Sequence, residues 1–210
     1  MRIFTGIALG EEVRRNILKE LKPFQKIGAP IRWTEEGNIH LTLKFIGEVG
    51  EPLAARIGEE LEKRLPAAPP FRLRARGFGK FPEGDDFHVF WAGVDADPHL
   101  QALFAGIESA LEPLGIARDA RPFHPHITLG RNKASRSRGT GTSGPMRSLQ
   151  PSMRGGAVRH NVKPLLALLE EKGAGLFGEW PVAAYRLFSS RLLPTGPVYT
   201  LLKEIPLVQS

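Results

Sequence analysis

The chain has 210 residues, 41% of them hydrophobic, which is enough to bury a core in one large domain or two small lobes. It has no cysteine and no apolar run of ~18 residues, which excludes disulfide bonds, thiolate zinc sites and a membrane-spanning helix. The formal net charge is +7, but eight basic and no acidic residues lie between Arg131 and Lys163, leaving 21 basic against 22 acidic residues elsewhere. We expect a cytoplasmic protein. Its excess positive charge is confined to one segment, which is expected to attract an anionic partner.

Hydrophobic periodicity predicts strands and helices that alternate along the chain. Strands are expected near residues 2–9, 31–33, 39–46, 71–78, 87–94, 125–131, 182–192 and 198–206. Helices are expected near residues 11–22, 52–65, 97–113 and 162–172. Two helix boundaries have a specific cause: Pro23 is expected to end the first helix, and Asp97 to cap the third ahead of Pro98.

Residues 132–160 interrupt this pattern. They are rich in Gly, Ser, Arg and Thr and show little periodicity, a composition that cannot bury enough apolar surface to offset its ordering entropy. We expect a flexible basic insertion, which is either an arm that contacts RNA phosphates or a solvated segment without a role. The clustering of cations without acidic residues favours the first interpretation.

A His-x-Thr-apolar tetrapeptide occurs twice, once with His40 and Thr42 and once with His126 and Thr128. On a strand, residues i and i+2 point to the same face, so each copy presents an imidazole and a hydroxyl together. Either copy alone is better explained as ordinary strand sequence, since threonine favours strands. Two copies facing each other would supply two acid/base groups and two hydroxyls, a set suited to in-line substitution at a phosphodiester.

With their flanks, the two motifs resemble the signature sequences of the RNA 2′,3′-cyclic phosphodiesterase (2′-5′ RNA ligase-like) family of two-histidine phosphoesterases. The similar stretches are residues 38–49, 121–131, 187–190 and 196–199, and the resemblance extends over nearly the whole chain apart from about 132–160. It implies an α+β fold of two similar lobes, each an antiparallel sheet flanked by helices. The lobes would be related by a pseudo-twofold axis, with the active-site cleft between them, in a single domain over residues 1–210.

The resemblance also implies a role for each motif residue. His40 would be the general acid that protonates the leaving ribose oxygen, and His126 the general base that activates water. Thr42 and Thr128 would hydrogen-bond the phosphoryl oxygens. An imidazole with a pKa of ~6.5 suits either role, and the near-symmetric motifs themselves do not show which histidine starts protonated. Arg131 is a candidate phosphate contact that is equally well explained as the first residue of the basic segment.

Other residues near the motifs are expected to support the fold. His124 shares the strand face of His126, and a supporting role is favoured over metal binding because no third ligand is in view. Lys44 alternates with the motif residues, so its side chain is expected to point out of the cleft. Core packing is expected for three aromatic residues that could otherwise stack on a base, namely Trp33, Phe45 and Phe123.

The reaction that the resemblance implies is metal-independent hydrolysis of RNA or nucleotide 2′,3′-cyclic phosphates to 2′-phosphomonoesters, without a cofactor. The expected partners are RNA or nucleotides with such ends, including tRNA fragments, and the expected state is a monomer. Two alternatives stay open. One is 2′-5′ RNA ligase activity at the same site, and the other is a non-catalytic RNA-binding module on the same scaffold.

Overall fold

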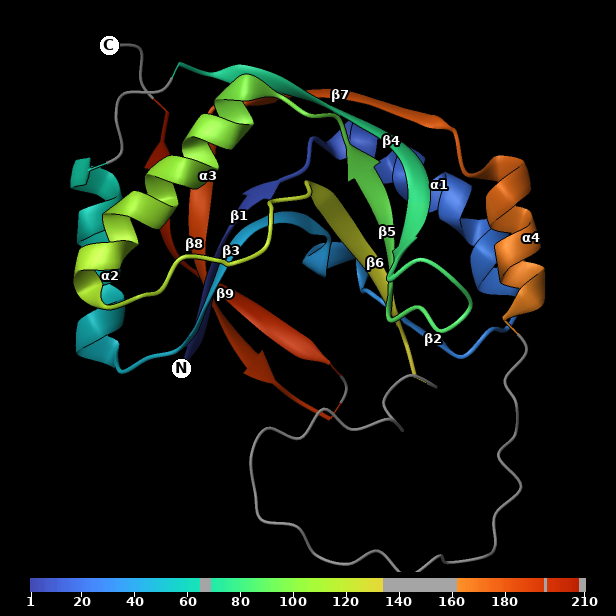
Figure 1. The fold of residues 1–210 in the computed structure, drawn as a ribbon, viewed down its shortest axis with the longest axis horizontal. Helices are drawn as coiled ribbons and strands as arrows, with labels where there is room; N and C mark the ends of the chain where they lie inside the picture. Colours follow the sequence, from blue (N-terminus) through green and yellow to red (C-terminus); the bar gives the residue numbers. More distant parts are fainter. Residues whose placement is uncertain (65–68, 134–161, 195, 208–210) are drawn as a thin grey trace, which may run out of the picture.

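The structure is a computed structural model that describes residues 1–64, 69–133, 162–194 and 196–207, so nearly all of the expected basic insertion lies outside the described residues. Within these ranges, α-helices separate single strands or groups of two or three strands (Figure 1). The strands are β1 (Arg2–Ala8), β2 (Ile31–Trp33), β3 (His40–Glu48), β4 (Phe71–Phe81), β5 (Val89–Val94), β6 (His126–Asn132), β7 (Leu176–Val182), β8 (Ala184–Leu192) and β9 (Pro197–Pro206). The α-helices are α1 (Glu11–Lys26), α2 (Glu51–Arg64), α3 (Pro98–Leu111) and α4 (Lys163–Lys172). The predicted α+β class is confirmed.

The strands form one antiparallel sheet that narrows at its centre. Their order is β7-β4-β5-β6-β3-β1-β8-β9, and β2 pairs with β6. A single residue pair, Leu41 with Ile127, joins β3 to β6. We call β3, β1, β8 and β9 the first half-sheet, and β6, β5, β4 and β7 with β2 the second half-sheet. These half-sheets correspond to the two lobes predicted from the sequence.

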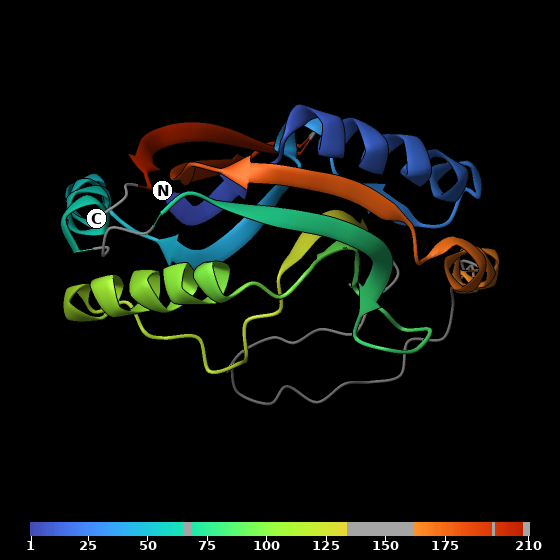
Figure 2. The same ribbon diagram turned by 90° about the horizontal axis from the view of Figure 1, so that it is seen from above.

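Two helices flank each half-sheet, and two of these four, α1 and α3, cover the half-sheet opposite to the strand they follow. Helices α2 and α3 contact each other and pack against β9 and β3, whereas α1 and α4 pack against β7 and β4. Figures 1 and 2 show these two pairs at opposite ends of the molecule. Helix α1 thus follows β1 of the first half-sheet but covers the second, and α3 follows β5 of the second but covers the first. In the described residues, no helix is both long and apolar enough to cross a membrane.

Helix α1 does not end at Pro23, as the sequence predicted, but continues to Lys26. The reason lies in Phe24, which is 1% exposed. Its ring packs against Phe78 and Phe90, with centroids 5.1 and 5.2 Å away. Burial of this large apolar side chain offsets the hydrogen bond that proline cannot donate. The predicted cap of α3 is confirmed, because the Asp97 carboxylate accepts hydrogen bonds from the first backbone N–H groups of the helix.

Strand β7 was not predicted, and a bulge explains why. The register of β7 against β4 shifts between Gly178 and Leu176, so the alternation of inward and outward residues is broken there. Phe177 and Trp180 are both buried although they are three residues apart. Strand β7 contains Pro181, which is tolerated because β7 lies at the edge of the sheet.

Candidate active site

The two motifs meet where the half-sheets join. Leu41 and Ile127, the middle residues of the two motifs, are paired across β3 and β6, and both are fully buried. In an antiparallel pair, the flanking residues then lie opposite each other and point to the other face of the sheet. Each motif histidine therefore lies across from the threonine of the other motif. The structure brings the four predicted residues together, with one histidine from each half-sheet.

The backbone holds both imidazoles in the same way. His40 Nδ1 lies 2.7 Å from the carbonyl oxygen of Asn38, and His126 Nδ1 lies 2.8 Å from that of His124. A carbonyl can only accept, so each Nδ1 carries the proton and Nε2 of the neutral ring is the acceptor. In His40, Nε2 is 3.0 Å from Thr42 Oγ1, which donates to it. His124 therefore supports His126 through its main chain, and in the described residues no group of three potential ligands is placed to hold a metal.

Aromatic rings pack against both imidazoles, which are partly buried. Phe4 stacks on His40 with centroids 4.9 Å apart, and Tyr199 meets the same ring edge-on at 5.3 Å. Phe81 meets His126 edge-on at 5.1 Å. Burial lowers the pKa of both His40 and His126 below the ordinary value, and the hydrogen bonds to the carbonyl groups oppose this in part. Both imidazoles are therefore biased toward the neutral form.

A pocket of about 200 Å³ opens beside the motifs. His40, Thr42, Thr128 and Arg131 line it, whereas His126 does not and lies beside it across the junction. The charge of Arg131 contributes to the lowered pKa of His126, after burial, so this side chain is close to both the pocket and the second imidazole. Further lining residues are Arg32, Trp33, Glu35, Asn38, Phe45, Pro197 and Tyr199. The pocket thus combines acid/base, hydroxyl and cationic groups.

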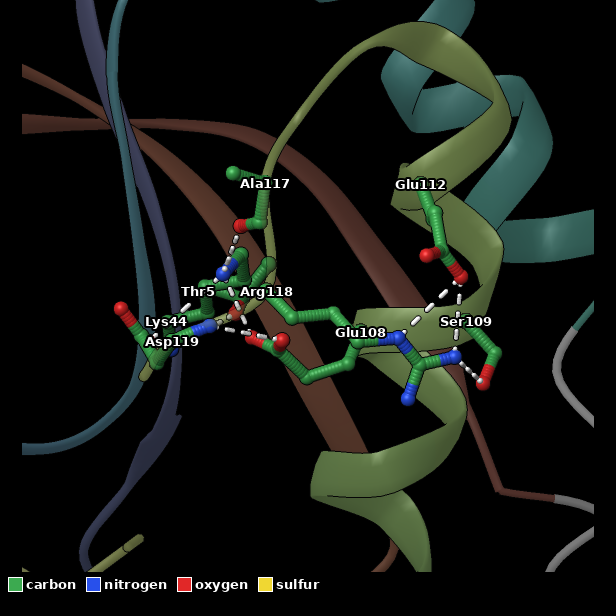
Figure 3. A network of polar contacts seen from close by, with 8 residues as sticks. All are labelled: Thr5, Lys44, Glu108, Ser109, Glu112, Ala117, Arg118 and Asp119. Carbon is green, nitrogen blue, oxygen red and sulfur yellow. Dashed lines mark hydrogen bonds and ion pairs between the residues drawn. The ribbon is translucent and has the colours of Figure 1, made fainter. Parts of the chain in front are cut away.

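Lys44 points away from this site and is buried in an ion pair (Figure 3). A register shift between β1 and β3 places both Leu43 and Lys44 inside the protein. Lys44 Nζ lies 2.5 Å from Glu108 Oε1 on α3 and donates to the carbonyl of Ala117 at 2.9 Å. The other Glu108 oxygen accepts from the Asp119 backbone N–H at 2.9 Å. This Lys44–Glu108 network ties the first motif strand to the loop that leads into the second.

The packing predictions for three aromatic residues had different outcomes. Trp33 packs edge-on against Phe90 at 5.6 Å, and Phe123 stacks on Phe104 at 4.4 Å, so both support the fold. The prediction for Phe45 was wrong, because this side chain is 65% exposed at the pocket wall. The same register shift that buries the residue before it turns Phe45 outward.

Two residues beside His40 lie outside the motifs and were not predicted from the sequence. Tyr199 lies in residues 196–199, a stretch that carries part of the family resemblance. The sequence therefore singled out this stretch but did not indicate a role for Tyr199. Gly6 gave no signal. A Cβ on Gly6 would lie 3.2 Å from His40 Cδ2 and 2.9 Å from the Leu41 carbonyl oxygen. Glycine at this position therefore lets β1 approach the first motif closely.

The fold and these motifs define a two-lobed α+β protein with a paired-histidine site. The profile of the 2′-5′ RNA ligase superfamily matches residues 33–140, which include both motifs. The chain belongs to this superfamily. The RNA 2′,3′-cyclic phosphodiesterases of Aeropyrum pernix and Thermus thermophilus are each 35% identical to it, over 185 and 219 residues. These alignments cover 87% and 99% of this chain, and 90% of each relative.

Solved structures share the fold over the whole chain. The crystal structure of TT0787 of Thermus thermophilus is 30% identical, with a TM-score of 0.67, and covers 99% of this chain and 98% of that one. Escherichia coli LigT complexed with 3′-AMP has a TM-score of 0.70 at 23% identity, with the same coverage. This second likeness supports the arrangement of strands and helices.

Proposed function

We propose that this protein hydrolyses 2′,3′-cyclic phosphate ends of RNA and nucleotides to 2′-phosphomonoesters. The observation that carries the proposal is the pairing of Leu41 with Ile127, which sets two His-x-Thr motifs side by side at the centre of the sheet. Relatives with 35% identity over most of the chain are named RNA 2′,3′-cyclic phosphodiesterases, which supports the substrate class. Each half-sheet supplies one histidine, so the two half-sheets would form one domain over residues 1–210. A monomer would then contain the complete active site.

In the proposed reaction, the oxygen of a water molecule attacks phosphorus opposite the P–O3′ bond. His126 Nε2 takes the proton from that water as the new P–O bond forms. The P–O3′ bond breaks, and His40 Nε2–H gives its proton to the leaving O3′. The products are a 2′-phosphate and a 3′-hydroxyl, and the histidines exchange protons with solvent before the next cycle. Each such acid or base typically contributes a factor of ~10²–10⁴ to the rate.

The hydroxyl groups and a nearby cation would stabilise the phosphate during this step. In the resting site, Thr42 Oγ1 donates to His40 Nε2. Once His40 is doubly protonated it donates instead, and the Thr42 hydroxyl is free to turn toward a phosphoryl oxygen. Thr128 lies opposite His40 and would contact the phosphoryl group from the second motif. Arg131 would add positive charge where the negative charge develops.

The test is turnover of 2′,3′-cyclic AMP in the presence of EDTA. His40→Ala and His126→Ala should each reduce kcat by a factor of ~10²–10⁴. The control is His88→Ala, which removes an exposed histidine that does not line the pocket and should leave kcat unchanged. Full activity in either motif variant would overturn the proposal, as would a product that is a 3′-phosphate by ³¹P NMR.

The superfamily match also supports a second reaction at the same site, 2′-5′ RNA ligation, in which a 5′-hydroxyl takes the place of the attacking water. The two histidines would keep their roles, with His126 taking the proton of the 5′-hydroxyl and His40 giving a proton to the leaving O3′. An RNA with a 2′,3′-cyclic phosphate end and a second RNA with a 5′-hydroxyl end, such as the halves of a cleaved tRNA, would reveal it as a joined product. RNA binding without turnover of any such substrate would instead indicate a non-catalytic binding module.

A further inference from the structure

Two arginine residues face each other in the wall of the pocket. Arg32 of β2 is paired directly with Arg131 of β6, so their side chains leave the sheet on the same face. Both line the pocket that His40 and Thr42 also line. Like charges directly opposite each other across strands are destabilising. The pairing therefore needs a compensating group.

The described residues do not supply that group. The Arg32 Nη2 atom is buried and has no hydrogen-bond partner. In the part of the chain that the structure describes, neither Arg32 nor Arg131 forms an ion pair, although Glu35 lines the same pocket. A buried guanidinium nitrogen such as Arg32 Nη2 costs free energy unless an acceptor reaches it, whereas Arg131 is exposed and free to meet a ligand from solvent. The charge of Arg131 also acts on Tyr199 in the pocket wall. Burial raises the pKa of Tyr199, and the positive charge of Arg131 opposes that rise.

We propose that Arg32 and Arg131 together bind a second phosphate of the substrate, the one on the 5′ side of the nucleotide that carries the cyclic phosphate. This inference rests on the proposed function, in which the reacting phosphate lies at the two motifs. A guanidinium presents N–H donors in a planar fork that matches phosphate oxygens, and two of them would share the charge of one phosphodiester. The pocket reaches from Thr42 and Thr128 to Arg32, so one terminal nucleotide would contact both places.

The arginine pair would then distinguish an RNA end from a cyclic nucleoside phosphate. Every internal nucleotide of RNA has a phosphate on its 5′ side, and a free 2′,3′-cyclic nucleoside phosphate lacks it. Arg32 would act as a specificity-determining residue, and its contribution would appear in KM more than in kcat, because the second phosphate takes no part in bond breaking.

The test compares 2′,3′-cyclic AMP with and without a 5′-phosphate at fixed ionic strength. The wild-type protein should prefer the 5′-phosphorylated substrate in kcat/KM by about tenfold, equivalent to about 1.4 kcal/mol. Arg32→Gln should lower this ratio toward one, mainly through KM, and Arg32→Lys should restore part of it. The matched control is Arg56→Gln, which removes an exposed arginine of α2 outside the pocket and should keep the ratio.

Three results would overturn the inference. They are equal kcat/KM for the two substrates in the wild-type protein, an equal loss on both substrates in a folded Arg32→Gln variant, or the same fall in the ratio in Arg56→Gln. Calorimetry separates this inference from the proposed function, because it needs no turnover. If the protein hydrolyses neither substrate, adenosine 2′,5′-bisphosphate should still bind more tightly than 2′-AMP, and Arg32→Gln should remove the difference. Equal binding of the two nucleotides would refute the second phosphate site.

Discussion

Replacing Lys44 with methionine should destabilise the protein by about 3–5 kcal/mol, the cost of leaving one charge of a buried pair without its partner. Lys44 is 2% and Glu108 4% exposed, and both oxygens of the carboxylate are engaged, one by Nζ and one by the Asp119 N–H. The variant also leaves the Ala117 carbonyl without its donor. For a protein of this size, about 1 kcal/mol corresponds to roughly 2–4 °C in Tm, so the variant should melt roughly 6–20 °C lower.

The assay is urea unfolding followed by circular dichroism, which gives the free energy of unfolding and its slope. The double variant Lys44→Met/Glu108→Gln should recover most of the loss, because it removes the isolated charge and keeps an amide oxygen to accept from the Asp119 N–H. A cycle completed with Glu108→Gln alone would measure the coupling between the two side chains.

The control is an exposed ion pair that joins β1 to β3. Arg2 Nε lies 3.0 Å from Glu48 Oε1, but these side chains are 61% and 74% exposed. Arg2→Met should change the free energy of unfolding by less than about 1 kcal/mol, because water screens the pair. A fall in the free energy of unfolding that is no larger for Lys44→Met than for Arg2→Met would refute this reasoning. A further fall in the free energy of unfolding when Glu108→Gln is added to Lys44→Met would also refute it, because the isolated buried charge would then not be the cause of the loss.

Further predictions concern the proposed chemistry and the core. The pH profile of kcat/KM should be bell-shaped with its maximum below pH ~6.5, because burial lowers the pKa of both imidazoles. Activity should fall at low pH because His126 gains a proton, and at high pH because His40 loses one. A maximum above pH 8 would contradict these roles. Arg131→Gln should move the acidic limb to higher pH, since the arginine helps to lower the pKa of His126; an unmoved limb would place Arg131 away from that imidazole. Phe24→Ala should cost about 3–5 kcal/mol in urea unfolding, whereas a cost under about 1 kcal/mol would mean that Phe24 does not hold α1 together past Pro23.

The motif residues could be predicted from the sequence because their arrangement depends only on local spacing. A histidine and a threonine two residues apart share a strand face whatever surrounds them, and the duplication pointed to a common site. Features that depend on long-range packing could not be predicted from the sequence. Helix α1 passes Pro23 only because Phe24 finds the rings of another half-sheet. The unpaired state of Arg32 depends on its register against β6, which no local pattern contains.

The position of β1 has a consequence for how the chain becomes active during synthesis. Of the described strands, β1 leaves the ribosome first, and it pairs with β3 on one side and with β8, made almost last, on the other. The ring of Tyr199, which closes over His40, arrives later still on β9. A nascent chain that has both motifs therefore lacks part of the wall around its first imidazole. Because Tyr199 of β9 completes the pocket wall beside His40, we expect full activity only after β9 has been made.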